Sequence, residues 1–189
     1  TGVAGIVVYG DFHDSIQSRI FKPLVRICNG KIMHDKDGNP FFPEDVRPEK
    51  IVKEAITYFH DTYGCRIFNL SAGNGESIYQ GGRQFPWASM LDDLSRELDI
   101  VIVVSAGNVP NPLINEFSSR DELMQKSRDQ LFDPEHRLID PATSALSITV
   151  GSITRSEEPA VPRGAMRNPL SVGQKDYPSV FTRIGKGVN

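Results

Sequence analysis

Two stretches of the sequence decide the fold: Arg66–Asn74, which is RIFNLSAGN, and Ile100–Asn108, which is IVIVVSAGN. Each opens with a strand-like run, Arg66–Leu70 and Ile100–Val104, and the second run contains only Ile and Val. β-Branched residues favour extended backbone, and a continuously apolar strand suits a sheet that is covered on both faces. We therefore expect two buried strands, each followed by the same tetrapeptide, Ser-Ala-Gly-Asn.

Two further segments predict strands, and three predict or permit helices. Pro23–Cys28 and Leu146–Val150 are short, largely apolar runs that we interpret as buried strands. Apolar residues recur every three or four positions over Pro48–Tyr63 and Trp87–Leu98, which indicates amphipathic helices. The run Gly5–Tyr9 is too short for its periodicity to separate a short buried helix from a strand.

The second amphipathic helix should have one apolar and one polar side. Trp87, Leu91, Leu94 and Leu98 form the apolar stripe. We expect the opposite side to be filled by four charged residues, Asp92, Asp93, Arg96 and Glu97.

The order of these segments predicts an α/β fold. Strands that alternate with helices favour a three-layer arrangement, in which helices flank a mostly parallel sheet. In such sheets the ligand site lies at the carboxyl ends of the strands. At 189 residues the chain is long enough for about one domain.

Three stretches predict irregular structure. Val109–Pro141 is rich in Asn, Asp, Pro and Ser, and we interpret residues 109–141 as a surface insertion. Thr154–Leu170 contains three prolines and predicts a second loop. The turn signals Asn29-Gly30 and Asp37-Gly38 predict a hairpin-like excursion.

Composition excludes several classes of protein. The net charge is −3, so the chain has no basic surface for nucleic acid or for an anionic membrane. Its longest apolar runs are far shorter than the roughly 20 residues of a membrane-spanning helix. Two cysteines, Cys28 and Cys65, do not make a disulfide framework.

The repeated Ser-Ala-Gly-Asn has two interpretations. Small residues at a strand end let a ligand approach the backbone closely, and an Asn there can donate its side-chain amide to a developing oxyanion. The alternative is that small residues and Asn simply form turns, and for one copy alone this simpler interpretation is favoured.

Five stretches carry a resemblance to a known family: Thr1–Val7, Arg66–Gly73, Val103–Asn108, Asp140–Ala142 with Leu146–Ile153, and Pro178–Arg183. Together they resemble the subtilisin-like serine proteases (subtilases, peptidase S8). VVSAGN at Val103–Asn108 is similar to the oxyanion-hole motif of that family. The five stretches match in family order, over nearly the whole chain. The resemblance implies a subtilisin-like fold and a serine endopeptidase that acts through an Asp-His-Ser triad.

The triad itself is absent from the matched positions. Thr1 corresponds to the third residue of the family's His-Gly-Thr, so the catalytic His would precede this chain. The nucleophile motif Gly-Thr-Ser-x-Ala-x-Pro does not occur, and none of the four histidines, His13, His34, His60 and His136, has the family context. The chain also begins without Met. We therefore expect residues 1–189 to be the central part of a catalytic domain, incomplete and inactive alone.

The resemblance assigns roles to seven residues. It implies that Asn108 donates a hydrogen bond in the oxyanion hole. Ser71, Ala72 and Gly73 would bind extended substrate by strand addition. Ser105, Ala106 and Gly107 would form the opposite wall of the first specificity pocket. The small residues of both walls would leave that pocket open to a sizeable side chain.

The partners and cofactors follow from these roles. The partner would be a peptide or protein substrate, and apolar surface left open by an incomplete domain would favour self-association. No cofactor is required; calcium is common in the resembling family, but no motif here supports a site. Asp11, His13 and Asp14 could bind a metal, but capping of the opening segment is favoured. The sequence leaves the cellular location of the protein open.

Two other functions also stay open. The chain could be a non-catalytic pseudoprotease that binds peptides or a partner protein, which the sequences flanking it would reveal. A weaker alternative is an unrelated α/β ligand-binding domain, which predicts nucleotide binding.

Overall fold

The structure is a computed structural model of the chain. It describes residues 2–10, 12–109, 121, 122, 125, 126, 129, 132–153, 176, 178, 179 and 181–185. The whole of the predicted loop at Thr154–Leu170 and much of the predicted insertion at 109–141 therefore lie outside the described residues, as does Asp11. The chain divides into two compact units, residues 1–47 and 48–189.

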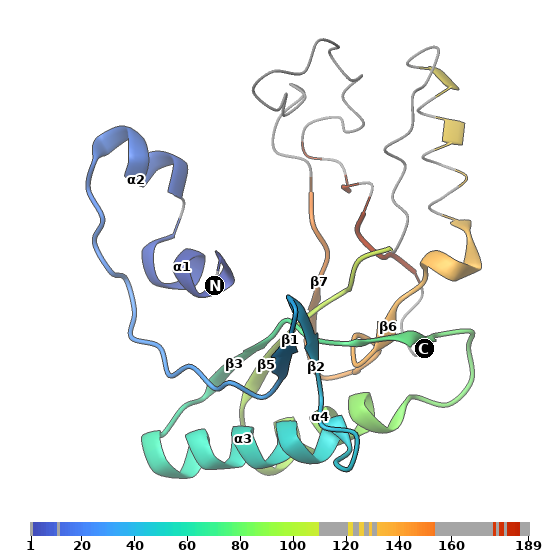
Figure 1. Ribbon diagram of the computed structural model, residues 1–189, viewed down its shortest axis with the longest axis horizontal. Helices are drawn as coiled ribbons and strands as arrows, with labels where there is room; N and C mark the ends of the chain where they lie inside the picture. The colour runs from blue at the N-terminus through green and yellow to red at the C-terminus, as the bar shows by residue number, and fades with distance from the viewer. Residues whose placement is uncertain are drawn as a thin grey trace. The chain divides into compact units, whose positions relative to one another are not determined.

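The first unit contains two short helices and a hairpin (Figure 1). The helices are α1 (Gly2–Tyr9) and α2 (Phe12–Ser18). Strands β1 (His34–Lys36) and β2 (Asn39–Phe41) pair antiparallel. Asp37 and Gly38 both have positive φ, as a tight turn of this kind requires, which confirms the hairpin predicted at Asp37-Gly38. The segment Gly5–Tyr9 is helical.

The strand predicted at Pro23–Cys28 is wrong. These residues form no regular element, and Leu24, Val25 and Ile27 are exposed. The composition favours a strand, but β-propensity expresses itself only where a partner strand and a packing surface exist. Among the described residues, no strand pairs with this segment.

The second unit is built on a parallel sheet of three strands in the order β3-β5-β7. These strands are β3 (Ile67–Leu70), β5 (Val101–Ser105) and β7 (Ile148–Val150). All three predicted runs in this unit are therefore strands, with ends within two residues of expectation. Two short strands, β4 (Asn74–Ile78) and β6 (Ile139–Asp140), pair antiparallel beside the sheet.

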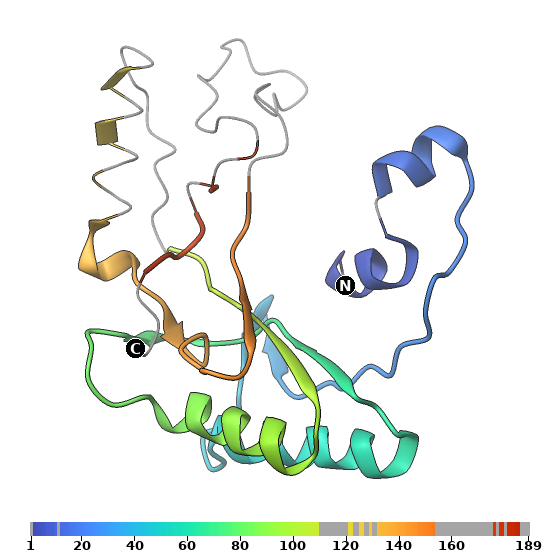
Figure 2. The same cartoon turned by 180° about the vertical axis from the view of Figure 1, so that it is seen from behind.

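Two helices cover one face of the parallel sheet (Figure 2). They are α3 (Pro48–Tyr63) and α4 (Pro86–Glu97), and both confirm the predicted periodicity. Pro at the first helical position suits both helices, because its missing N–H has no partner there. Val52 of α3, Leu91 and Leu94 of α4, and Ile102 and Val104 of β5 are buried and make the core.

The other face of the sheet is apolar but open among the described residues. Ile67 is 75% exposed, and Val101, Ile148 and Val150 are also exposed. Strand register places Ile67 beside Val101, and Val103 beside Ile148, so these side chains form one continuous surface. The parallel sheet with helices confirms the α/β fold.

The polar side predicted for α4 is wrong at Asp92, which is buried. Its side chain is only 7% exposed, and its carboxylate accepts hydrogen bonds from Gln84, Ser144 and the backbone N–H groups of Ala145 and Leu146. Burial raises the pKa of Asp92, but these hydrogen bonds outweigh burial and lower it below the usual value. A carboxylate on the predicted solvent side of the helix thus fastens α4 to the turn before β7.

Candidate functional site

Both Ser-Ala-Gly-Asn segments leave the parallel sheet at the same edge. Leu70 at the end of β3 lies beside Val104 of β5, and their strands run in the same direction. Ser71 follows β3, and Ser105 is the last residue of β5. The predicted site residues therefore gather at the carboxyl edge of the sheet, where α/β folds place their ligands.

The two asparagines differ in what their side chains do. The side-chain amide of Asn74 is used locally: its Nδ2 donates to Ser77 at 2.9 Å, and its Oδ1 accepts from the N–H of Glu76 at 3.0 Å. Asn108 is exposed, and within the described part of the chain its side chain has no hydrogen-bond partner. Asn74 thus behaves as a turn residue, whereas Asn108 can still donate to a ligand.

Gly107 is required by both conformation and space. Its φ is +90°, where L-residues are strained. A Cβ there would lie 2.8 Å from Cδ1 of Ile139 and 3.1 Å from Cδ of Arg183. Gly73 is also crowded, because its Cβ would meet the Asp140 carbonyl oxygen at 3.0 Å and Cδ1 of Ile139 at 3.1 Å.

The side chain of Ile139 therefore packs against both glycines. It is buried and projects from β6, whose partner β4 continues from Gly73. The open first specificity pocket stays a prediction, and β6 adds a branched side chain that contacts a glycine on each predicted wall. The sequence near Gly73 and Gly107 gives no sign of this contact, because Ile139 is more than 30 residues away from both.

The backbone around Asn108 is held by the segment 181–185. The N–H of Arg183 donates to the Gly107 carbonyl at 3.0 Å, and the N–H of Val109 donates to the Phe181 carbonyl at 2.9 Å. Asn108 and Thr182 form the antiparallel bridge between these two bonds. On the other side, the N–H of Ala106 donates to the Val150 carbonyl at 2.8 Å. The loop is thus fixed at its backbone while the Asn108 side chain is exposed.

Asp140 links the edge of the site to helix α4. Its Oδ1 accepts from the N–H of Ala88 at 2.9 Å, at a helix start where Phe85 gives no side-chain cap. Burial raises the pKa of Asp140 to about 6; hydrogen bonds from the N–H groups of Ala88 and Trp87 oppose this rise, and the charge of Glu49 adds to it. The peptide bond from Asp140 to Pro141 is cis.

The end of the predicted surface insertion forms part of this structure. Leu138, Ile139, Asp140 and Pro141 are buried, whereas Phe132 is exposed. Composition cannot separate these residues from the polar stretch before them. Leu138 and Ile139 are apolar, and a folded chain tends to bury apolar residues. This is the signal that could have identified the end of the segment as buried.

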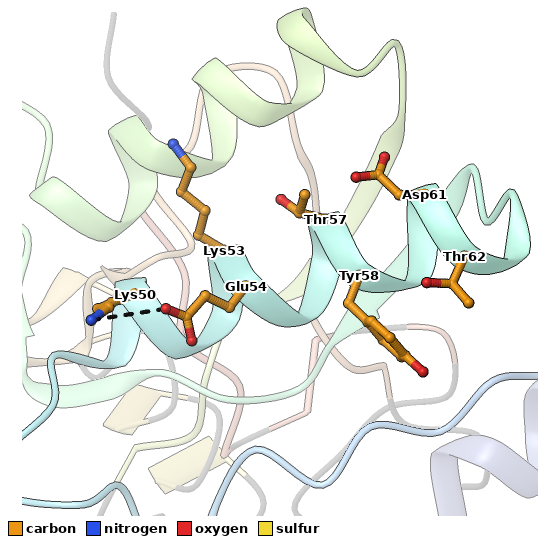
Figure 3. A pocket seen from close by; sticks show the side chains of 7 residues that line it. All are labelled: Lys50, Lys53, Glu54, Thr57, Tyr58, Asp61 and Thr62. Carbon is orange, nitrogen blue, oxygen red and sulfur yellow. Dashed lines mark ion pairs between the residues drawn. The ribbon is translucent and has the colours of Figure 1, made fainter.

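A surface depression in the second unit lies elsewhere. It measures ≈ 570 Å³ and is lined only by residues of α3, as Figure 3 shows: Lys50, Lys53, Glu54, Thr57, Tyr58, Asp61 and Thr62. The exposed ion pair of Lys50 with Glu54, at 3.9 Å, follows ordinary helix spacing. No second element contributes a group to this depression, so it is not the candidate site.

Neither a metal cluster nor a membrane helix emerges from the described residues. No group of three or more His, Cys, Asp or Glu side chains among them could hold a metal ion. None of the described helices combines the length and apolarity needed to cross a membrane.

Comparison with known proteins places the chain in a family. The family model described as the subtilase family, peptidase S8, matches residues 1–188. An uncharacterised protein from Sinorhizobium fredii is 34% identical over 137 residues, which are 72% of this chain and 31% of that protein. The chain therefore spans less than a third of the length of this relative. No solved structure matches the present chain. With a family match that covers all but the last residue, the chain belongs to the subtilases, a family of serine peptidases.

Proposed function

We propose that the chain forms the substrate cleft and part of the oxyanion hole of a serine endopeptidase that hydrolyses peptide bonds. The observation that carries this proposal is the contrast between the two asparagines. The side-chain amide of Asn74 is hydrogen-bonded to Ser77 and Glu76. The side chain of Asn108, in contrast, is exposed on a backbone that is held by hydrogen bonds at the carboxyl edge of the sheet.

Asn108 acts on the charge that develops during the reaction. When a serine hydroxyl attacks the substrate carbonyl, the carbonyl oxygen becomes anionic, and a side-chain N–H donor stabilises that charge. The donor must be positioned beforehand, because reorganisation during the reaction would cancel part of the gain. The backbone bonds of Gly107 and Val109 to segment 181–183 support such preorganisation.

The strand ends beside Asn108 bind the substrate. Ser71, Ala72 and Gly73 follow β3, and Ser105, Ala106 and Gly107 end β5 and continue it. A peptide in extended conformation pairs with the backbone of the first three residues by strand addition, while the second three form the opposite wall of the first specificity pocket. Gly73 is exposed, which suits this role. The partner is therefore a peptide or protein substrate.

The nucleophile and its base come from residues other than these 189. The sequence contains neither His-Gly-Thr nor Gly-Thr-Ser-x-Ala-x-Pro, and a serine needs a His base that is oriented by a carboxylate. This absence also favours the alternative function, in which a non-catalytic subtilase-like module binds peptides or a partner protein without cleaving them. No cofactor enters the proposed reaction, and calcium is not part of it.

Peptide hydrolysis and peptide binding, measured on the same full-length protein, separate the two functions. The proposal expects fluorogenic peptides to be cleaved, with burst release of the first product if an acyl-enzyme accumulates. It also expects cleavage to stop after treatment with a reagent that phosphonylates catalytic serines. Tight peptide binding without cleavage would contradict the endopeptidase and favour the binding module.

A further inference from the structure

Arg183 is a buried cation that binds backbone rather than a carboxylate. The residue is only 3% exposed. Nε donates to the Asn108 carbonyl at 2.9 Å, and Nη1 donates to the carbonyls of Glu135 at 2.8 Å and Arg137 at 3.0 Å. Burying a guanidinium is costly, so these charge-assisted hydrogen bonds must offset a substantial desolvation penalty.

These bonds join three segments that are distant in the sequence. The backbone N–H of Arg183 holds the Gly107 carbonyl, while its side chain holds the next carbonyl, that of Asn108. The other two acceptors precede β6, whose Ile139 packs against Gly107. Arg183 thus fixes two successive peptide groups, and their orientation determines where the Asn108 side chain can reach.

We propose that Arg183 is a positioning residue that holds the main chain of Asn108 and so directs its side-chain amide at the substrate carbonyl. The proposal rests on the oxyanion role proposed for Asn108. A planar guanidinium offers donors in a fixed fork, which a single ammonium cannot reproduce across three separate carbonyls. The oxyanion donor therefore depends on the side chain of a residue that does not touch the substrate.

The test is a double-mutant cycle in the full-length protein, with Arg183→Lys and Asn108→Ala measured singly and together. Arg183→Lys should lower kcat about tenfold or more with KM nearly unchanged, because the interaction matters only in the transition state. In the Asn108→Ala background the same substitution should have little further effect on kcat, since the donor that it positions is gone.

Arg66→Lys is the matched control. Nη1 of Arg66 also donates to a backbone carbonyl, that of Asp99 at 3.0 Å, but at the opposite edge of the parallel sheet. This substitution should leave kcat and KM unchanged. Additive effects of Arg183→Lys and Asn108→Ala, or an unchanged kcat in Arg183→Lys, would overturn the proposal.

Amide hydrogen exchange gives a readout that does not depend on activity. The N–H of Val109 donates to Phe181 beside the Arg183 contact, so Arg183→Lys should accelerate its exchange about tenfold, while Val103 and Val104 in β5 keep their protection. If Arg183→Lys does not fold, Arg183→Gln, which keeps a planar donor group, takes its place. Unchanged exchange at Val109 would contradict the holding role even if activity fell.

The two proposals fail in different ways. A full-length protein without peptidase activity, or with normal kcat in Asn108→Ala, refutes the oxyanion role of Asn108, and with it the catalytic consequence of Arg183. If Asn108→Ala lowers kcat as expected, but the effects of Arg183→Lys and Asn108→Ala on kcat are additive, only the positioning role of Arg183 is refuted.

Discussion

At the scale of single residues, identical sequence does not give identical contacts. The chain contains Ser-Ala-Gly-Asn twice, and each copy follows a parallel strand. In the first copy the chain turns into β4, and the Asn74 side chain caps that turn through Ser77 and Glu76. In the second copy, segment 181–183 supplies backbone hydrogen bonds to Gly107 and Val109, and the side chain of Asn108 is exposed. Only contacts distant in the sequence distinguish the two.

The buried carboxylate of Asp92 should matter far more for stability than its exposed neighbour. Asp92→Ala removes the acceptor of four hydrogen bonds and leaves the N–H groups of Ala145 and Leu146 without it. We expect a loss of at least about 3 kcal/mol in the free energy of unfolding. Chemical denaturation of the chain measures it.

Asp93→Ala is the matched control for that measurement. Asp93 is the next residue of α4, and its exposed ion pair with Arg96, at 3.7 Å, contributes little. Its substitution should change the free energy of unfolding by no more than about 0.5 kcal/mol. Equal losses in Asp92→Ala and Asp93→Ala would contradict the buried network.

At the scale of elements, the start of helix α4 is held by a residue of a strand that is distant in the sequence. The helix begins after Phe85 with no side-chain cap of its own, and Asp140 of β6 supplies the acceptor for Ala88. Asp92 fastens the middle of the same helix to the turn before β7. Helix α4 is thereby tied to β6, which borders the candidate site, and to the turn before β7, which lies at the amino end of the parallel strands.

Asp140 gives this connection a dependence on pH. Its pKa is about 6 in the folded chain and ordinarily 3.8, so the folded state binds more protons between these values. The contribution of Asp140 to stability therefore falls as pH rises from about 4 to about 6. Relative to Asp140→Asn, the wild-type chain should gain about 2 to 3 kcal/mol in free energy of unfolding when pH falls from 7 to 4.

Denaturation curves of the wild-type chain and Asp140→Asn between pH 4 and 7 test this expectation. The comparison isolates Asp140, since the lowered pKa of Asp92 acts in the opposite direction and is common to both proteins. Parallel pH profiles of the two proteins would show that Asp140 does not titrate in this window.

At the scale of the whole molecule, the sequence predicts what periodicity controls. Helices α3 and α4 and the three parallel strands follow from apolar spacing, because each must bury one side against a neighbour. The pairing of β4 with β6 could not be predicted, since it joins Asn74 to Asp140 across the intervening helix and strand. Neither could the burial of Asp92 or Arg183, because a charged residue that is buried and hydrogen-bonded looks like an exposed one in sequence.

The open apolar face of the parallel sheet should make the 189-residue chain self-associate. Ile67, Val101, Ile148 and Val150 form a continuous exposed surface, and apolar surfaces of this kind promote association. Light scattering at tens of micromolar, roughly the range in which exposed apolar surface aggregates, should report a mass above that of a monomer. Ile67→Lys and Ile148→Lys together should restore the monomer. A clean monomer for the wild-type chain would contradict the expectation.

The most direct test of the oxyanion role compares Asn108→Ala with Asn74→Ala in the full-length protein. The two substitutions remove the same group from the same tetrapeptide at the same edge of the sheet. We predict that Asn108→Ala lowers kcat for peptide hydrolysis by about 10²–10³-fold with little change in KM, while Asn74→Ala leaves kcat unchanged. Equal effects of the two substitutions, or an unaltered kcat in Asn108→Ala, would contradict the assignment of Asn108 to the oxyanion hole.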